Sequence, residues 1–251
     1  MSETPLLVAR NVNKSFGSFV ALAGVDLQLR RGERRALIGP NGAGKTTFIS
    51  VIGGQQAGGA GGLVQFDGQD ISGAPPHTIA RMGIGRTFQI SRVFRKLSVF
   101  ENMLSAMLPA TGGALGLRRA RLEALREASM EMLAQVGLAE LADEMAEAIS
   151  HGDRKRLEFG MVLAGQPRLL LLDEPTAGMG IAERSELMEM MVRHIGASDI
   201  TLLFVEHDID IVFRFADAIT VMARGKVFAE GTPAQIAADR SVQDIYLGAA
   251  H

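Results

Sequence analysis

The sequence contains no cysteine and no tryptophan, and it has a single tyrosine among its 251 residues. Without cysteine, the chain has neither a disulfide framework nor a thiolate metal site. It also lacks any run of 18 apolar residues, so no membrane-spanning helix is expected. The first residues, 1–5, lack the charged-then-apolar pattern of a secretory signal. These absences together predict a cytoplasmic protein that reaches a membrane only through a partner.

An excess of one charge is absent as well. Lys and Arg number 26 against 28 Asp and Glu, for a formal net charge of −2. General nucleic-acid binders usually carry a basic excess, so no nucleic-acid partner is expected. Hydrophobic residues make up 47% of the chain, which supplies a core and excludes wholesale disorder. The length allows one large domain or two small ones.

The apolar patterns predict an α/β protein. Alternation at Leu6 and Val8, and again over 25–29, predicts short strands near the N-terminus. The continuous apolar runs 169–172 and 202–205 are typical of strands that are buried on both faces of a parallel sheet. An apolar helix face over 187–195 lies between these runs, which gives a βαβ-like order.

The middle of the chain predicts a different kind of structure. Residues 91–160 lack strand alternation and are expected to be mostly helical. Within them, 118–136 reads as an amphipathic helix that stops near Gly137. Earlier, six glycines between 53 and 62 predict a flexible surface connection.

A glycine-rich phosphate loop follows the apolar strand expected over 35–38, and the helix expected over 46–52 comes directly after it. The loop matches G-x-x-x-x-G-K-[ST] with Gly39, Pro40, Asn41, Gly42, Ala43, Gly44, Lys45, Thr46 and Thr47. Glycines let backbone N–H groups close around phosphate oxygens, and the helix N-terminus adds a favourable dipole. Lys45 supplies a charge for the β- and γ-phosphates, and the Thr46 hydroxyl can ligate Mg²⁺.

A pair of acids ends the apolar run 169–172. Successive side chains of a strand point to opposite faces, so Asp173 and Glu174 are expected to differ in role. We expect Asp173 to bind Mg²⁺ through a water molecule. Glu174 is then expected to act as the general base or to position the attacking water. Taken alone, such a pair is also compatible with a solvated strand end.

In this order the motifs resemble those of the nucleotide-binding subunit of an ABC transporter, and the resemblance covers nearly the whole chain. It implies ATP and Mg²⁺ as ligands. It also implies a P-loop NTPase (RecA-like) fold, with a parallel-sheet core, an N-terminal antiparallel β part and an inserted helical subdomain. The chain would then be one ABC ATPase domain, 1–251. Its core would comprise 1–90 and 161–251, and its helical subdomain 91–160.

Three further residues take roles from this resemblance. Phe16 stands where the family places an aromatic ring that stacks on adenine. Gln89, in the segment 85–89, resembles the Q-loop glutamine that contacts Mg²⁺ or the attacking water. His207 resembles the switch histidine, which hydrogen-bonds the γ-phosphate and orients Glu174. The resemblance therefore implies Glu174, His207 and Gln89 as the catalytic group.

The segment 149–153 resembles the family's LSGGQ signature. Its Ser150 and Gly152 would bind the γ-phosphate of an ATP held by the opposite subunit. His151 and Asp153 depart from the family's Gly and Gln, and Ile149 replaces Leu. Likewise, 177–180 corresponds to the D-loop, with a glycine at 180 in place of the usual aspartate.

The resemblance also implies partners. These are a second ATPase subunit, the same or related, two transmembrane permease subunits and, indirectly, a periplasmic solute-binding protein. The chain would lie peripherally on the cytoplasmic face of the inner (plasma) membrane. Segments 87–89, 99–102, 206–208 and 231–248 are similar to importers of branched-chain amino acids. Urea or amide importers and lipopolysaccharide-type exporters are alternatives. A soluble non-transport ABC ATPase, or a GTPase or small-molecule kinase, would belong to a different class.

Overall fold

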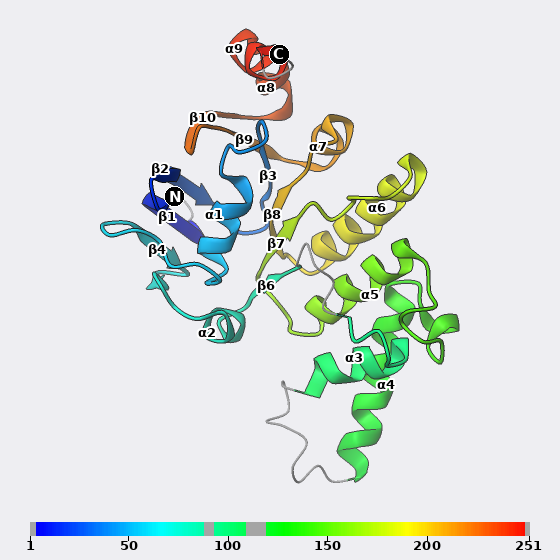
Figure 1. Ribbon diagram of the computed structural model, residues 1–251. Coiled ribbons are helices and arrows are strands. Elements are labelled where there is room, and N and C mark those ends of the chain that lie inside the picture. The colour runs from blue at the N-terminus through cyan, green and yellow to red at the C-terminus, as the bar shows by residue number, and fades with distance from the viewer. Residues whose placement is uncertain (1–3, 88–92, 109–118, 249–251) are drawn as a thin grey trace.

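The computed structural model describes residues 4–87, 93–108 and 119–248 (Figure 1). The strands are β1 (Leu7–Phe16), β2 (Phe19–Leu29), β3 (Arg34–Ile38), β4 (Leu63–Phe66), β5 (Gln69–Asp70), β6 (Ile84–Arg86), β7 (Leu169–Asp173), β8 (Thr201–Val205), β9 (Ala218–Ala223) and β10 (Lys226–Gly231). The helices are α1 (Lys45–Ile52), α2 (Pro76–Arg81), α3 (Val99–Met107), α4 (Arg119–Gln135), the 3₁₀ helix η2 (Ala139–Leu141), α5 (His151–Leu163), α6 (Ile181–Ala197), α7 (Ile209–Phe215), α8 (Pro233–Ala238) and α9 (Arg240–Gly248).

Two sheets form the framework. The first is antiparallel, with the strand order β2-β1-β4-β5, and the second has the order β10-β9-β3-β8-β7-β6. In the second sheet β9, β3, β8, β7 and β6 are parallel, whereas β10 pairs antiparallel with β9. A two-residue turn joins β9 to β10, and such a short connection permits only antiparallel pairing. This arrangement confirms the predicted fold class.

The central strands carry apolar residues on both faces because both faces of the sheet are covered. Along β7, Leu170 and Leu172 belong to a cluster with residues of α5, α6 and α7. The alternate residues Leu169 and Leu171 belong to a second cluster with residues of α1 and the antiparallel sheet. The strand is therefore continuously apolar, as predicted for a parallel strand buried on two sides.

One local prediction is wrong and a second is incomplete. In β1 the buried face carries Leu7 and Ala9, whereas Val8 is half-buried, so the predicted phase is off by one residue. The glycine-rich segment 53–62 is a surface connection, as predicted, with residues 57–61 exposed, but hydrogen bonding holds it against β1. The Gly59 N–H donates to the Asn13 carbonyl (2.6 Å), and a Cβ on Gly62 would lie 2.9 Å from the Asn11 carbonyl oxygen. The glycines therefore permit close backbone approach.

The expected helix over 118–136 is present as α4. It ends before Gly137, whose φ of +74° is readily adopted only by glycine. Figure 1 shows α3 and α4 at the opposite side of the molecule from α8 and α9. Across the described residues, no helix combines the length and the apolar character needed to cross a membrane.

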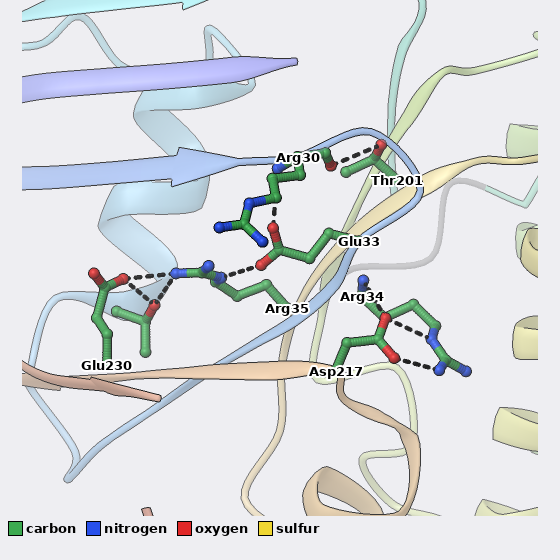
Figure 2. A network of polar contacts seen from close by, with 8 residues as sticks. Arg30, Glu33, Arg34, Arg35, Thr201, Asp217 and Glu230 are labelled. Atoms are coloured by element: carbon green, nitrogen blue, oxygen red, sulfur yellow. Dashed lines mark hydrogen bonds and ion pairs between the residues drawn. The ribbon is translucent and has the colours of Figure 1, made fainter. Parts of the chain in front are cut away.

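A network of charged groups anchors the beginning of β3 (Figure 2). Arg35 donates through Nε to Glu33 (2.6 Å) and through Nη1 to Glu230 on β10 (2.7 Å). Arg34 makes two hydrogen bonds with the carboxylate of Asp217, which lies just before β9. Burial alone would raise the pKa of Asp217, but the Arg34 guanidinium holds it below its usual value. The network fixes the strand whose other end leads into the phosphate loop.

Candidate nucleotide-binding site

The phosphate loop connects β3 to α1, and its path requires glycine at two close approaches. Gly39 has φ +145°, and a Cβ there would lie 2.0 Å from the Met222 carbonyl oxygen. Gly44 has φ +101°, and a Cβ there would lie 2.6 Å from the Ala21 carbonyl oxygen. Neither position can accept a side chain without moving backbone, so the loop's curvature depends on both glycines.

Helix α1 begins at Lys45 with Gly44 as its N-cap residue, and no side chain caps it. The first N–H groups of the helix are therefore available for an anion. The Lys45 ammonium bends back over the loop and donates to the carbonyl oxygens of Gly39 (2.7 Å) and Pro40 (3.0 Å). Burial lowers the pKa of Lys45, while the carboxylates of Glu174 and Asp173 oppose that shift.

Thr46 and Asp173 meet at the end of the loop, with the Thr46 hydroxyl 3.2 Å from Asp173 Oδ1. Arg86 of β6 donates to the other oxygen, Oδ2, at 3.3 Å. Burial raises the pKa of Asp173, although Arg86 and Thr46 act in the opposite direction. No group of three or more His, Asp or Glu side chains converges on a metal position in the described parts of the chain. One carboxylate and one hydroxyl fit Mg²⁺, which keeps several waters and takes its other ligands from phosphates.

Glu174 and His207 form the second functional pair. His207 Nε2 lies 2.8 Å from Glu174 Oε1, and since an ionised carboxylate only accepts, Nε2 carries the hydrogen. Glu174 directly follows β7 and has φ +51°, an uncommon conformation for a residue with a side chain. This turn carries its carboxylate toward the loop that follows β8. The structure thus joins two residues that the sequence analysis assigned from separate motifs.

A second carboxylate, Glu206, ties the same two loops together beneath this pair. It is 5% exposed and accepts hydrogen bonds from the Thr176 N–H (3.1 Å) and the Thr176 hydroxyl (2.6 Å). Its other oxygen accepts from the His207 N–H at 3.1 Å. The sequence analysis gave no role to Glu206, Thr176 or Arg86. A buried acid beside a candidate catalytic histidine is the signal that could have drawn attention to Glu206.

The phosphate loop, Glu174 and His207 border one cleft of about 180 Å³. Its lining residues are Phe19, Ala21, Asn41, Gly42, Ala43, Gly44, Lys45, Thr46, Thr47, Glu174 and His207. The aromatic ring in this lining belongs to Phe19, which the sequence analysis missed. The predicted ring, Phe16, pairs with Phe19 across the β1–β2 hairpin, is 47% exposed and has the Lys14 ammonium over it.

The predicted signature residues lie apart from this cleft. Ser150 and Gly152 are not in its lining; they lie at the beginning of α5, where Ser150 is the N-cap residue. The Ser150 hydroxyl accepts from the Asp153 N–H (3.0 Å) and donates to the Asp153 carboxylate (2.7 Å). Gln89 lies outside the described residues.

Comparison with protein families finds two matches. The model described as "ABC transporter" matches residues 22–177. The model described as "Branched-chain amino acid ATP-binding cassette transporter" matches residues 226–251. The first match contains the phosphate loop, both acids at the end of β7 and the segment 149–153. The second covers β10 and the C-terminal helices.

Individual proteins agree with these matches. The chain is 39% identical to the high-affinity branched-chain amino acid transport ATP-binding protein LivG of Escherichia coli and 35% identical to BraF of Pseudomonas aeruginosa. Each alignment covers 98% of this chain and 99% of the relative.

Solved structures show the same similarity. One is the ADP conformation of MJ1267, an ATP-binding cassette of an ABC transporter. It superposes with a TM-score of 0.84 at 30% identity, over 98% of this chain and 99% of the MJ1267 chain. The dimeric post-hydrolysis state of the cassette MJ0796, bound to ADP and Pi, superposes with a TM-score of 0.77 at 25% identity. The superposition covers 90% of this chain and 98% of the MJ0796 chain.

Proposed function

Because the chain belongs to the ATP-binding proteins of ABC transporters, of the branched-chain amino acid type, we propose that it powers the import of branched-chain amino acids or related small polar solutes. Members of this family bind ATP and couple its hydrolysis to transport, and this chain is such an ATPase. One observation carries the catalytic part of the proposal. The phosphate loop and the Glu174–His207 pair line the same cleft.

Binding of ATP rests on residues 39–47. The loop N–H groups and the uncapped start of α1 hold phosphate oxygens. The Lys45 ammonium leaves the carbonyls of Gly39 and Pro40 for the β- and γ-phosphates. Phe19 offers a ring at the edge of the cleft, so we assign the adenine contact to the hairpin that carries Phe16 and Phe19.

Hydrolysis requires a water held in line with the γ-phosphate. The Glu174 carboxylate accepts a proton from that water. Before ATP binds, His207 holds this carboxylate through its Nε2–H, and once ATP is present the same N–H would turn to a γ-phosphate oxygen. Thr46 and Asp173 would hold Mg²⁺, with Gln89 as a further ligand, and the ion would supply charge neutralisation at the β- and γ-phosphates.

The active unit is a dimer of ATPase subunits. Ser150 and Gly152 are absent from the lining of the chain's own cleft, so they are free to serve an ATP held by a second subunit. The start of α5 presents helix N–H groups for that γ-phosphate. The dimeric, nucleotide-bound MJ0796 structure supports this arrangement.

Two transmembrane permease subunits complete the transporter, and they receive solute from a periplasmic binding protein. A groove of about 570 Å³, bordered by α2, β6 and α5, offers a docking place for helices of these permeases. Arg86 lines this groove and also contacts Asp173, so docking at the groove is connected to the metal-binding carboxylate. The chain would therefore lie on the cytoplasmic face of the inner membrane.

Uptake of labelled solutes tests the substrate. Cells whose own copy is replaced by Lys45→Ala should lose uptake of labelled leucine, isoleucine or valine, while cells with the wild-type chain retain it. Loss of urea or amide uptake with normal leucine uptake would instead assign the chain to those importers. Unchanged uptake of all these solutes would contradict a role in import.

A further inference from the structure

A single arginine joins two segments of the site, 177–180 and the loop that follows β8. Arg184 lies in the first turn of α6, one third exposed. Its Nε donates to the Met179 carbonyl at 2.8 Å, and its Nη1 donates to Asp208 Oδ2 at 3.3 Å. It therefore holds the segment 177–180 with one side of its guanidinium and the residue that follows His207 with the other.

Asp208 has little freedom to move away from this contact. Its second oxygen, Oδ1, accepts from the N–H groups of Asp210 (3.1 Å) and Ile211 (3.4 Å), which makes it the N-cap residue of α7. With both oxygens engaged, Asp208 fixes the backbone just after His207. The Glu206 carboxylate fixes the backbone just before it. The imidazole that reaches Glu174 is thus carried by a loop held on both sides.

The segment 177–180 touches the start of α5 as well. His151 Nε2 lies 3.1 Å from the Ala177 carbonyl oxygen. A Cβ on Gly152 would lie 3.4 Å from the Met179 methyl group, so this buried side chain packs on the glycine. Gly180 offers no side chain for a contact of its own. Besides the Thr176–Glu206 contact, a second connection from this segment to the loop of His207 therefore runs through the Met179 carbonyl and the Arg184 guanidinium.

We propose that Arg184 is a positioning residue for the Glu174–His207 pair, which it aligns according to the position of the segment 177–180. The proposal rests on the catalytic roles of Glu174 and His207 given above. The start of α5 would face the second ATP of the dimer. A shift of α5 would move the Met179 carbonyl, and Arg184 would pass that shift to Asp208 and to the His207 loop. Hydrolysis in one site would in this way depend on occupancy of the other.

The substitutions that test this are chosen to spare the fold. Asp208→Asn removes the charge that faces Arg184, yet asparagine caps a helix as well as aspartate does. Arg184→Met keeps much of the aliphatic stem, and Arg184→Lys keeps the charge but not the planar fork that makes two contacts. The matched control is Arg214→Met. It breaks a 2.6 Å ion pair with Glu189 that links the same helices, α7 and α6, away from these loops.

Steady-state ATP hydrolysis is then measured on each purified full chain, which gives kcat at saturating Mg-ATP and KM. The Tm of each chain is measured as well. Arg184→Met should lower kcat by about 10- to 100-fold with KM nearly unchanged, since misalignment of a held group has effects of that size. Asp208→Asn should lower kcat in the same way, and the double variant should be no slower than either single variant. The kcat of Arg184→Lys should lie between those of the wild type and Arg184→Met. Arg214→Met should keep the wild-type kcat.

His207→Ala in the same series separates the two ways of failing. If His207→Ala is slow and Arg184→Met hydrolyses ATP at the wild-type rate, the inference about Arg184 is wrong and the proposed function stands. If His207→Ala itself hydrolyses at the wild-type rate, the role of His207 fails and the inference fails with it. A loss of kcat in Arg214→Met equal to that in Arg184→Met would overturn the inference in favour of general loosening of α6 and α7.

Discussion

His207 Nε2 lies 2.8 Å from Glu174 Oε1, and this contact joins the loops that follow two neighbouring parallel strands, β7 and β8. Glu174 reaches it from a left-handed backbone conformation, φ +51°. Of the two side chains, His207 is the more exposed, at 47% against 27% for Glu174. The pair therefore stands at the edge of the phosphate cleft, where a water and a γ-phosphate could meet it.

Glu174→Gln should retain ATP binding and slow hydrolysis by about 10²- to 10⁴-fold, the usual loss for a general base. Glutamine is nearly isosteric with glutamate and removes one negative charge beside the γ-phosphate, so the closed dimer should also accumulate. Size exclusion in the presence of Mg-ATP should show a dimer for this variant and mostly monomer for the wild type. The comparison is Asp173→Asn, which should weaken Mg-ATP binding and trap no dimer. Hydrolysis at the wild-type rate by Glu174→Gln would remove Glu174 from the catalytic group.

Lys45→Ala should abolish ATP binding or hydrolysis and leave the fold intact. The Lys45 ammonium contacts only loop carbonyls of Gly39 and Pro40 in the described structure, and its burial disfavours the charged form. Binding of a fluorescent ATP analogue and circular dichroism measure the two effects. Lys226→Ala, on an exposed position of β10, is the control and should bind normally. An unfolded Lys45→Ala chain, or one with wild-type ATPase activity, would contradict the assignment.

Ser150→Arg should prevent ATP-dependent dimerisation while nucleotide binding by the monomer is nearly unchanged. A bulky cation would fill the space proposed for the partner's γ-phosphate. The substitution also removes the N-cap of α5, which costs about 1 kcal/mol. Ser98→Arg controls for that loss, because Ser98 is the N-cap residue of α3 and closes a capping box with Glu101. Light scattering in the Glu174→Gln background should show dimers for Ser98→Arg only. Dimers of both variants would mean that the start of α5 does not face the second ATP.

Asp217→Asn should change how stability depends on pH. Arg34 holds the folded-state pKa of Asp217 below its ordinary value, so the folded chain releases this proton more readily than the unfolded chain does. The stabilisation is present above the ordinary pKa and is lost as the pH falls through the lowered one. Urea unfolding should therefore show the wild type more stable than Asp217→Asn near neutral pH. The two should converge below about pH 4. A constant difference across this range would show that the Arg34–Asp217 contact does not respond to protonation.

Much of the site could be predicted because its parts are contiguous. Residues 39–47 form one continuous motif, a loop that runs into the first turn of α1, and the strand before it and this helix follow from the apolar pattern. Asp173 and Glu174 end a run of leucines, so their place at a sheet edge follows from the strand alone. The βαβ order and the apolar runs likewise predicted the parallel core. The phase of β1 was predicted wrongly. The contact of the glycine-rich segment 53–62 with β1 was not foreseen, because the packing of that segment depends on which strand lies beside it.

The amino-acid sequence by itself thus determined the phosphate loop, the acids at the end of β7 and the class of fold, since each depends on neighbours along the chain. The family resemblance implied that His207 orients Glu174, but only the tertiary structure showed how this contact is made and which other distant side chains meet. Strand order places β8 between β3 and β7, so the loop after it brings His207 to Glu174 and Glu206 to Thr176. The hairpin placed Phe19 in the cleft, and helix packing set Arg184 against Asp208. Such contacts depend on strand order and helix packing across the whole fold, which no local spacing in the sequence encodes.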